Sequence, residues 1–152
     1  EKDVIQSNID DIVIHIRSGD IFNSNPHPKY VPPPLYYYTK ILNNNYYKKI
    51  IIVAEDRKNP VINKLLSLYK NAIYNKNSLV KDIKIILGAT NLINSIGTFA
   101  ITLSVMSKYI KNIFTTNLYS KDLKEYYILN KPWKNTYKQR NYILTYKQPI
   151  LK

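Results

Sequence analysis

The 152-residue sequence contains no cysteine and only two histidines, three glycines and one methionine. Without cysteine, the chain has no disulfide, no thiolate zinc site and no cysteine nucleophile. His15 and His27 alone are too few to favour a histidine-built metal site. No apolar run approaches the roughly 18 residues that a membrane-spanning helix needs, so the sequence predicts no membrane span.

Glycine is scarce, and its positions exclude the familiar phosphate-binding loops. None of Gly19, Gly88 and Gly97 precedes a Lys-Ser or Lys-Thr pair, so a P-loop is absent. The Gly-x-Gly-x-x-Gly fingerprint of dinucleotide-binding domains is absent as well. A phosphate site in this chain would therefore use an arginine and the free N–H groups at the start of a helix.

Acidic residues are few: 10 Asp and Glu stand against 23 Lys and Arg, which gives a net charge of +13. Isoleucine, lysine, asparagine and tyrosine, which have AT-rich codons, make up 76 of the 152 residues, and lysine is spread along the chain. The excess of lysine is therefore consistent with coding bias and a solvated surface. The other interpretation is an acidic partner such as nucleic acid, to which a basic protein is suited.

The composition predicts one folded domain. A hydrophobic fraction of 45% argues against disorder, and 152 residues suffice for a hydrophobic core. The chain begins at Glu1, close to a predicted strand and without a signal pattern, which is typical of a fragment or a cut domain. We expect a single domain over residues 1–152, with its core at about 11–116 and a C-terminal extension at 117–152.

Short apolar segments rich in β-branched residues alternate with amphipathic segments. The predicted strands cover residues 11–17, 49–54, 72–74, 91–94 and 112–115. The predicted helices cover residues 35–43, 60–70, 79–87, 98–109 and 122–129. This alternation predicts an α/β fold, a Rossmann-like parallel sheet with helices on both faces.

Four local features complete this prediction. Residues 22–34 contain five prolines and are expected to form a loop. Ser78 is a candidate N-cap of the helix that follows it. The inward face of that helix is predicted to carry Leu79, Ile83, Ile86 and Leu87. Residues 142–146 are a candidate edge strand.

The first candidate site follows the first predicted strand, because ligands of an open parallel sheet bind beyond the carboxyl ends of its strands. His15 and Arg17 are two residues apart, so both side chains point to one face near that end. Arginine can hold a phosphate with two hydrogen bonds. The alternative is a structural ion pair of Arg17 with Asp20 or Asp82.

The second candidate site is the loop before the helix predicted over residues 98–109. Gly97 allows a backbone to approach closely, and Thr98 offers a hydroxyl group. The free N–H groups at the start of that helix favour an anion. Plain capping of the helix by Ser95 or Thr98 is the alternative.

The third candidate is Asp82, a carboxylate in an otherwise apolar stretch. It could accept hydrogen bonds from a purine edge or from ribose hydroxyls, and the alternative is a solvent-facing residue of an amphipathic helix. Glu55 and Asp56 follow the second predicted strand, where a place at the edge of the site and a role in the turn are equally open. His27 is interpreted as a loop residue only.

Together these segments resemble a known enzyme family. His15-Ile-Arg17-Ser-Gly-Asp20 resembles the HxRxxD motif of fucosyltransferase-type enzymes with the GT-B fold, the group of α1,2-, α1,6- and protein O-fucosyltransferases. Residues 51–56 are similar to the second strand and acidic turn of the family's donor domain. Residues 80–83 and 89–99 are similar to its helix, strand and phosphate loop. The resemblance runs from about residue 11 to residue 116.

The resemblance implies a glycosyltransferase. The chain would be the nucleotide-sugar-binding half of a GT-B fold and would transfer a sugar, most often fucose from GDP-fucose, to a glycan or protein acceptor. The reaction would be inverting and would use neither a metal nor another cofactor. The acceptor site would come from an N-terminal half for which this chain has no room, so we expect weak donor binding and little turnover by this polypeptide alone.

The resemblance also implies roles for individual residues. Arg17 would hold the β-phosphate and stabilise the departing diphosphate, which makes it the expected catalytic residue. His15 would contact the nucleotide, Asp82 would bind the guanine, and Asp20 would brace the loop. The phosphate loop would contribute Ser95, Gly97, Thr98 and the N–H group of Phe99.

One position departs from the family pattern: many members carry a second arginine where this chain has Ser18. Two other functions stay open from the sequence. One is a different nucleotide-using α/β transferase. The other is a basic, non-catalytic α/β module that binds nucleic acid or another polyanion.

Overall fold

The computed structural model describes residues 4–116 and 121–147. Its strands are β1 (Asp11–His15), β2 (Lys49–Val53), β3 (Ala72–Tyr74), β4 (Asn91–Ile93) and β5 (Asn112–Phe114). Its α-helices are α1 (Leu35–Asn44), α2 (Pro60–Leu68), α3 (Leu79–Leu87), α4 (Phe99–Met106), α5 (Lys124–Asn130) and α6 (Tyr137–Thr145). A 3-10 helix, η1 (Gly19–Phe22), follows β1. Strands and helices alternate from β1 to β5, as the sequence predicts.

These strands form one five-stranded sheet in the order β3-β2-β1-β4-β5, and every neighbouring pair is parallel. The chain runs outward from β1 through β2 to β3, and then returns to the other side of β1 for β4 and β5. The strand order therefore reverses between β1 and β4, and ligands of such sheets bind at the carboxyl ends of the strands where this reversal occurs. The α/β prediction with a Rossmann-like parallel sheet is confirmed.

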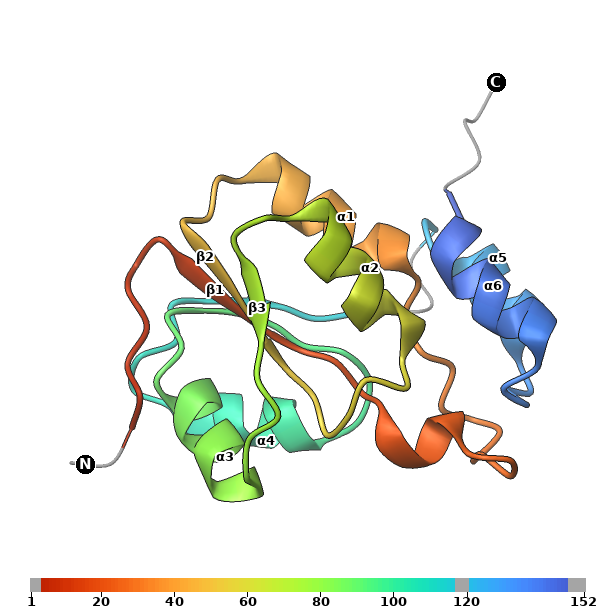
Figure 1. The fold of residues 1–152 in the computed structure, drawn as a ribbon, viewed down its shortest axis with the longest axis horizontal. Helices are drawn as coiled ribbons and strands as arrows, with labels where there is room; N and C mark the ends of the chain where they lie inside the picture. The colour runs from red at the N-terminus through yellow and green to blue at the C-terminus, as the bar shows by residue number, and fades with distance from the viewer. Residues whose placement is uncertain (1–3, 117–120, 148–152) are drawn as a thin grey trace.

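Helices cover both faces of the sheet, α1 and α2 on one and α3 and α4 on the other (Figure 1). Ile12 and Ile14 of β1 belong to the core beneath α1 and α2, and Val13 belongs to the core beneath α3 and α4. All three are fully buried. Because both faces are covered, the strands are apolar almost throughout, which is the pattern that favours a parallel sheet.

Several predicted elements are longer than the observed ones. The strand predicted over residues 11–17 ends at His15, and the helix predicted over residues 98–109 ends at Met106. The Ile16 N–H still donates to the Val53 carbonyl oxygen at 2.9 Å, so the chain leaves the sheet only at Arg17. Among the described residues, no helix combines the length and the apolar character that a membrane crossing requires.

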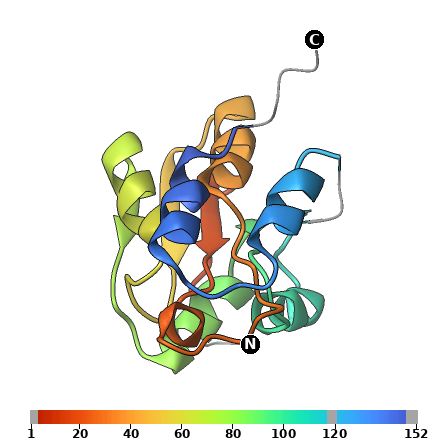
Figure 2. The ribbon, with the colours of Figure 1, turned by 90° about the vertical axis from the view of Figure 1, so that its right-hand side faces the viewer.

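The C-terminal extension packs on the layer formed by α1 and α2. Helix α6 contacts both of these helices, and its dark-blue ribbon lies between the ribbons of α2 and α5 in the view of Figure 2. The Trp133 side chain is 1% exposed, and its indole N–H donates to the Ile21 carbonyl oxygen at 2.7 Å. This segment therefore extends the hydrophobic core that begins at β1.

The edge strand predicted over residues 142–146 is wrong, because these residues belong to α6 and its C-cap. A capping box formed by Thr136 and Gln139 starts this helix. Its Tyr142 ring stacks on Tyr126, with 5.6 Å between the centroids, and Ile143 is fully buried. Capping and tertiary packing thus override the β-forming composition of the segment.

The buried face of α3 also differs from the prediction. Ser78 caps the helix as expected, since its side chain accepts a hydrogen bond from a first-turn N–H group. Leu79, however, is 64% exposed. The residues that α3 buries are Asp82, Ile85 and Ile86. The apolar side of this helix is thus turned only partly inward, and Leu79 and Val80 on it are exposed. Tertiary packing, and not the apolar spacing alone, determines the buried face.

Substitutions in α3 test this burial. We expect Ile86→Ala to lower the free energy of unfolding by about 3 kcal/mol, because it removes buried methyl groups and leaves a cavity. Leu79→Ala is the matched control and should change stability by no more than about 0.5 kcal/mol, because its side chain is already in solvent. Urea denaturation measures both values. Equal losses for the two variants would contradict the assigned orientation of α3.

Candidate functional site

A cavity of about 390 Å³ opens where β1 and β2 end, on the side of the sheet that α3 and α4 cover. Four residues singled out in the sequence line it together: His15, Arg17, Asp82 and Phe99. The other lining residues are Ile16, Ser18, Val53, Ala54, Glu55, Asn77 and Leu79. The sheet topology brings these separate segments to one place, because the carboxyl ends of parallel strands meet at one edge.

Arg17 is held at this cavity by Asp20. Its Nη2 donates to Oδ1 of Asp20 at 2.7 Å and to Oδ2 at 2.9 Å, so the ion pair with Asp20 is the one that forms. The Asp20 side chain is 61% exposed, and water therefore screens this contact. Within the described structure Nε and Nη1 make no hydrogen bond, so the guanidinium keeps donors for a ligand. The guanidinium carbon also lies 5.8 Å from the ring centroid of Tyr30.

His15 is 7% exposed, and its ring lies 5.4 Å from that of Phe99. Burial, reinforced by the charge of Arg17, lowers the pKa of His15 from 6.5 to about 4, whereas Asn94 acts in the opposite direction. The imidazole is therefore neutral at pH 7. Its Nδ1 atom has no hydrogen-bond partner among the described residues. Buried polar atoms without a partner are rare, so this one favours a ligand site.

Asp82 brings a carboxylate to the cavity from the first turn of α3. It is 8% exposed, and its Oδ1 accepts a hydrogen bond from Asn77 Nδ2 at 3.0 Å. Burial raises the pKa of Asp82, against the opposing effects of the Asn77 hydrogen bond and the Lys81 charge. The interpretation of Asp82 as a solvent-facing helix residue is therefore wrong.

The loop before α4 reaches the cavity only through Phe99. Ser95 is 2% exposed, and its Oγ accepts a hydrogen bond from the Tyr38 hydroxyl at 3.1 Å, so it faces the layer of α1 instead. Gly97, with φ of +93°, and Thr98 are exposed and do not line the cavity. The side chain of Thr98 does not cap α4. Of the predicted phosphate loop, the structure thus brings one residue to the site.

Asn77 and Leu79 line the cavity but are not among the site residues predicted from the sequence. They flank the N-cap Ser78, and a helix start near the carboxyl edge of the sheet is the signal that could have indicated them. Of the two acidic residues after β2, Glu55 lines the cavity and Asp56 does not.

The charges in the cavity are unevenly placed. Arg17 is cationic, Glu55 and Asp82 are carboxylates, and His15 is neutral. An anion is favoured near the guanidinium, and groups that donate hydrogen bonds are favoured near the carboxylates. Phe99 and the exposed Leu79 add apolar surface. The cavity therefore suits a ligand with one anionic end and one end that carries N–H or O–H donors.

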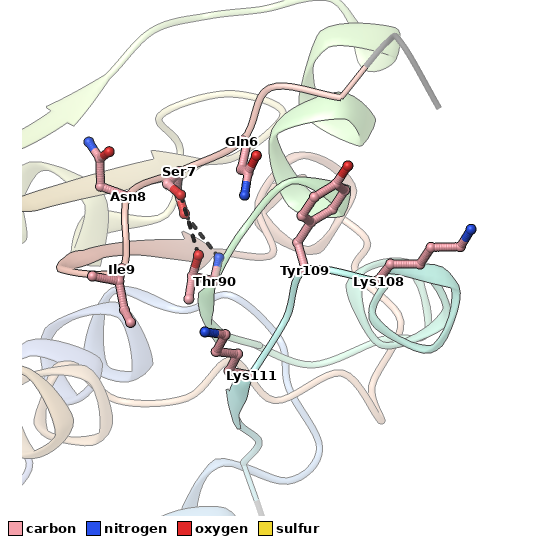
Figure 3. A pocket seen from close by; sticks show the side chains of 8 residues that line it. All are labelled: Gln6, Ser7, Asn8, Ile9, Thr90, Lys108, Tyr109 and Lys111. Carbon is pink, nitrogen blue, oxygen red and sulfur yellow. Dashed lines mark hydrogen bonds between the residues drawn. The ribbon is translucent and has the colours of Figure 1, made fainter.

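A second cavity, of about 480 Å³, lies at the amino edge of the sheet (Figure 3). There the Thr90 N–H donates to Ser7 Oγ at 2.9 Å, so these polar groups are already paired. The lysines that line it, Lys108 and Lys111, are exposed. Although this cavity is larger, we place the candidate site in the other one, because that cavity holds the buried imidazole of His15, whose Nδ1 atom has no hydrogen-bond partner among the described residues.

Among the described residues, no group of three or more His, Cys, Asp or Glu side chains could hold a metal ion. Comparison with known proteins gives no match: no protein-family model, no curated protein and no solved structure is significantly similar to the chain. The assignment of the site therefore depends on the geometry of its own residues.

Protonation of His15 is expected to destabilise the fold. The imidazole titrates near pH 6.5 in the unfolded chain, but its pKa is about 4 in the folded protein. As the pH falls, the unfolded state binds this proton first. The contribution of the neutral imidazole to the free energy of unfolding is therefore fully present above pH 6.5. It is lost as the pH falls from 6.5 to about 4, by roughly 3 kcal/mol. Urea denaturation at pH 7 and pH 4 measures the loss.

His15→Phe is the matched variant, because it removes the titrating group and keeps an aromatic ring beside Phe99. The variant should lose less stability than the wild type over the same pH range. An equal loss in both proteins would show that His15 does not carry this pH dependence.

Proposed function

We propose that the chain is the donor-binding half of a glycosyltransferase of fucosyltransferase type, and that its cavity binds a nucleoside diphosphate sugar, with GDP-fucose as the first candidate. One observation supports this most strongly. Arg17, with guanidinium donors that are unused within the described structure, and the buried His15, whose Nδ1 atom has no partner there, line one cavity where the strand order of a parallel sheet reverses. The resemblance to the HxRxxD motif supplies the class of ligand.

The uneven charge of the cavity fits such a ligand. The diphosphate would lie against Arg17, whose Nε and Nη1 make no hydrogen bond within the described structure and are available as charged donors. The N–H donors of a base would lie against Asp82, with Asn77 beside it and the apolar side chain of Leu79 available to the ring face. Two carboxylates elsewhere in the cavity disfavour a ligand that is anionic along its whole length.

In glycosyl transfer, the donor-binding half would stabilise the leaving group. In an inverting transfer, an acceptor hydroxyl attacks the anomeric carbon while the bond from that carbon to the β-phosphate oxygen breaks. Negative charge then builds up on the departing diphosphate, and the fixed guanidinium of Arg17 would stabilise it in the transition state. The acceptor and the group that takes its proton would be supplied by a second half across the cleft.

Removal of the guanidinium tests the proposal. We expect isothermal titration calorimetry to show GDP binding by the wild type and none by Arg17→Ala, because the diphosphate loses its charged partner. Arg57→Ala is the matched control and should bind as the wild type does. Its guanidinium lies 5.5 Å from the Tyr74 ring centroid, and Arg57 does not line the cavity. Unchanged GDP affinity in Arg17→Ala would contradict the proposal.

A panel of ligands separates the proposal from its rivals. Preference for UDP or CDP over GDP in thermal-shift measurements would favour a different nucleotide-using transferase. Binding to arbitrary DNA or RNA with a steep salt dependence and no response to any nucleotide would favour a basic module for polyanions.

A further inference from the structure

The loop that carries Arg17 is attached to the first turn of α2 by the polar side chains of Ser18, Asp56 and Asn59. Ser18 is 2% exposed and Asn59 is fully buried, so these contacts are interior ones. We infer that Asp56 is a positioning residue, which acts with Ser18 and Asn59 to fix Arg17 in the orientation that binds the diphosphate. The inference rests on the proposed function of the cavity and assigns a role to Asp56, which lies in the acidic turn after β2 and outside the HxRxxD motif.

Asp56 lies at the centre of the attachment. Its Oδ1 accepts hydrogen bonds from Ser18 Oγ at 2.5 Å, from the Gly19 N–H at 3.2 Å and from the Lys58 N–H at 3.0 Å. Its Oδ2 lies 3.5 Å from the Lys58 ammonium group. One carboxylate therefore joins the backbone after Arg17 to the turn that follows β2.

Asn59 holds the same loop from the other side. Its Nδ2 donates to the Arg17 carbonyl oxygen at 2.9 Å, and its backbone N–H donates to Ser18 Oγ at 3.0 Å. Its Oδ1 caps α2 by accepting a hydrogen bond from the Val61 N–H at 3.0 Å. The peptide group at Arg17 is thus fixed to the start of a helix.

The backbone of the loop leaves little room for another path. Gly19 adopts φ of +66°, in the left-handed region, and a Cβ at this position would collide with the Glu55 carboxylate. On the other side of Arg17, the Ile16 N–H is bonded to the Val53 carbonyl oxygen. Because the chain is fixed before and after Arg17, the ligand does not have to order this loop when it binds.

Asp56 is well suited to this role by its charge. Burial raises its pKa, but the hydrogen bonds from Ser18, Lys58 and Gly19 lower it further than burial raises it. The pKa therefore lies below the ordinary value, and the side chain is an anionic, strong acceptor at neutral pH. Asp56 does not line the cavity, so any effect on ligand affinity must pass through its neighbours.

The test compares nucleotide binding by two variants that each lose one carboxylate. Asp56→Ala leaves two donors of the loop, the Ser18 hydroxyl and the Gly19 N–H, without this acceptor, together with the Lys58 N–H. It should weaken GDP binding about tenfold. Asp10→Ala is the matched control, since Asp10 is exposed, precedes β1 at the opposite edge of the sheet and gives the same change in net charge. It should bind GDP as the wild type does. Asp56→Ala binding with wild-type affinity would overturn the inference.

A double-mutant cycle distinguishes positioning from a general loss of structure. Arg17→Lys keeps the charge but not the planar fork, so it should bind GDP weakly without depending on the orientation of the loop. In that background Asp56→Ala should weaken binding less than twofold. A further tenfold loss would show that Asp56 acts independently of Arg17, which also overturns the inference.

Amide hydrogen exchange in the absence of ligand tests this inference independently of the proposed function. The amide hydrogens of Gly19 and Asn59 should exchange faster with solvent in Asp56→Ala than in the wild type, because their hydrogen bonds depend on the attachment. If the wild type binds no nucleotide but this exchange is accelerated, the proposed function fails and the attachment stands. Unchanged exchange overturns the attachment, whatever the wild type binds.

If Asp56→Ala does not fold, Ser18→Ala replaces it in the same measurements. It removes one hydroxyl and leaves the Asp56 carboxylate to the Gly19 and Lys58 N–H groups. We expect GDP binding to weaken about threefold, because the hydrogen bond to Asp56 and the one from the Asn59 N–H are both lost while Asp56 itself remains. Wild-type affinity in a folded Ser18→Ala would count against the attachment.

Discussion

The structure depends on the simultaneous pairing of β1 with β2 on one side and with β4 on the other. Parallel neighbours cannot be joined by tight turns, so each connection must cross over the sheet through a helix. That requirement places α1 and α2 on one face and α3 and α4 on the other. It also fixes the point where the strand order reverses, at the end of β1. The position of His15 and Arg17 in the molecule follows from this pairing.

The few charged groups in the cavity at that edge determine which ligand it can bind. A neutral imidazole, one guanidinium and two carboxylates share a cavity with apolar side chains. Such a set does not attract anions in general, although the protein as a whole carries a net charge of +13. It distinguishes the two ends of a ligand instead. A nucleoside diphosphate, with an anionic end and a base that carries donors, has the matching distribution of charge and hydrogen-bonding groups.

The order of elements from β1 to β5 could be predicted because short apolar strands alternate there with helical segments. His15 and Arg17 could be assigned to one face because residues two apart in a strand share a face. Other features depend on contacts between distant parts of the sequence. Ser95 is turned away from the cavity by Tyr38, which lies 57 residues earlier in the chain.

The attachment of the Arg17 loop also depends on contacts between distant parts of the sequence, since Asp56 and Asn59 lie about 40 residues beyond the loop. The sequence places an acidic turn there but does not indicate what it binds. Helical periodicity could not identify the inward face of α3, where Leu79 is exposed and Asp82 is buried. In each case a tertiary contact, and not a local pattern, determines the outcome.

The most direct test of the central claim locates a bound nucleotide on the protein. In a titration of ¹⁵N-labelled protein with GDP, the claim predicts that the largest amide chemical-shift changes fall on residues 15–19, residues 77–82 and Phe99, all beside the cavity at the carboxyl edge. The largest changes on residues 6–9 and 108–111 at the amino edge would contradict it. So would changes spread over the lysine-rich surface that vanish when salt is added.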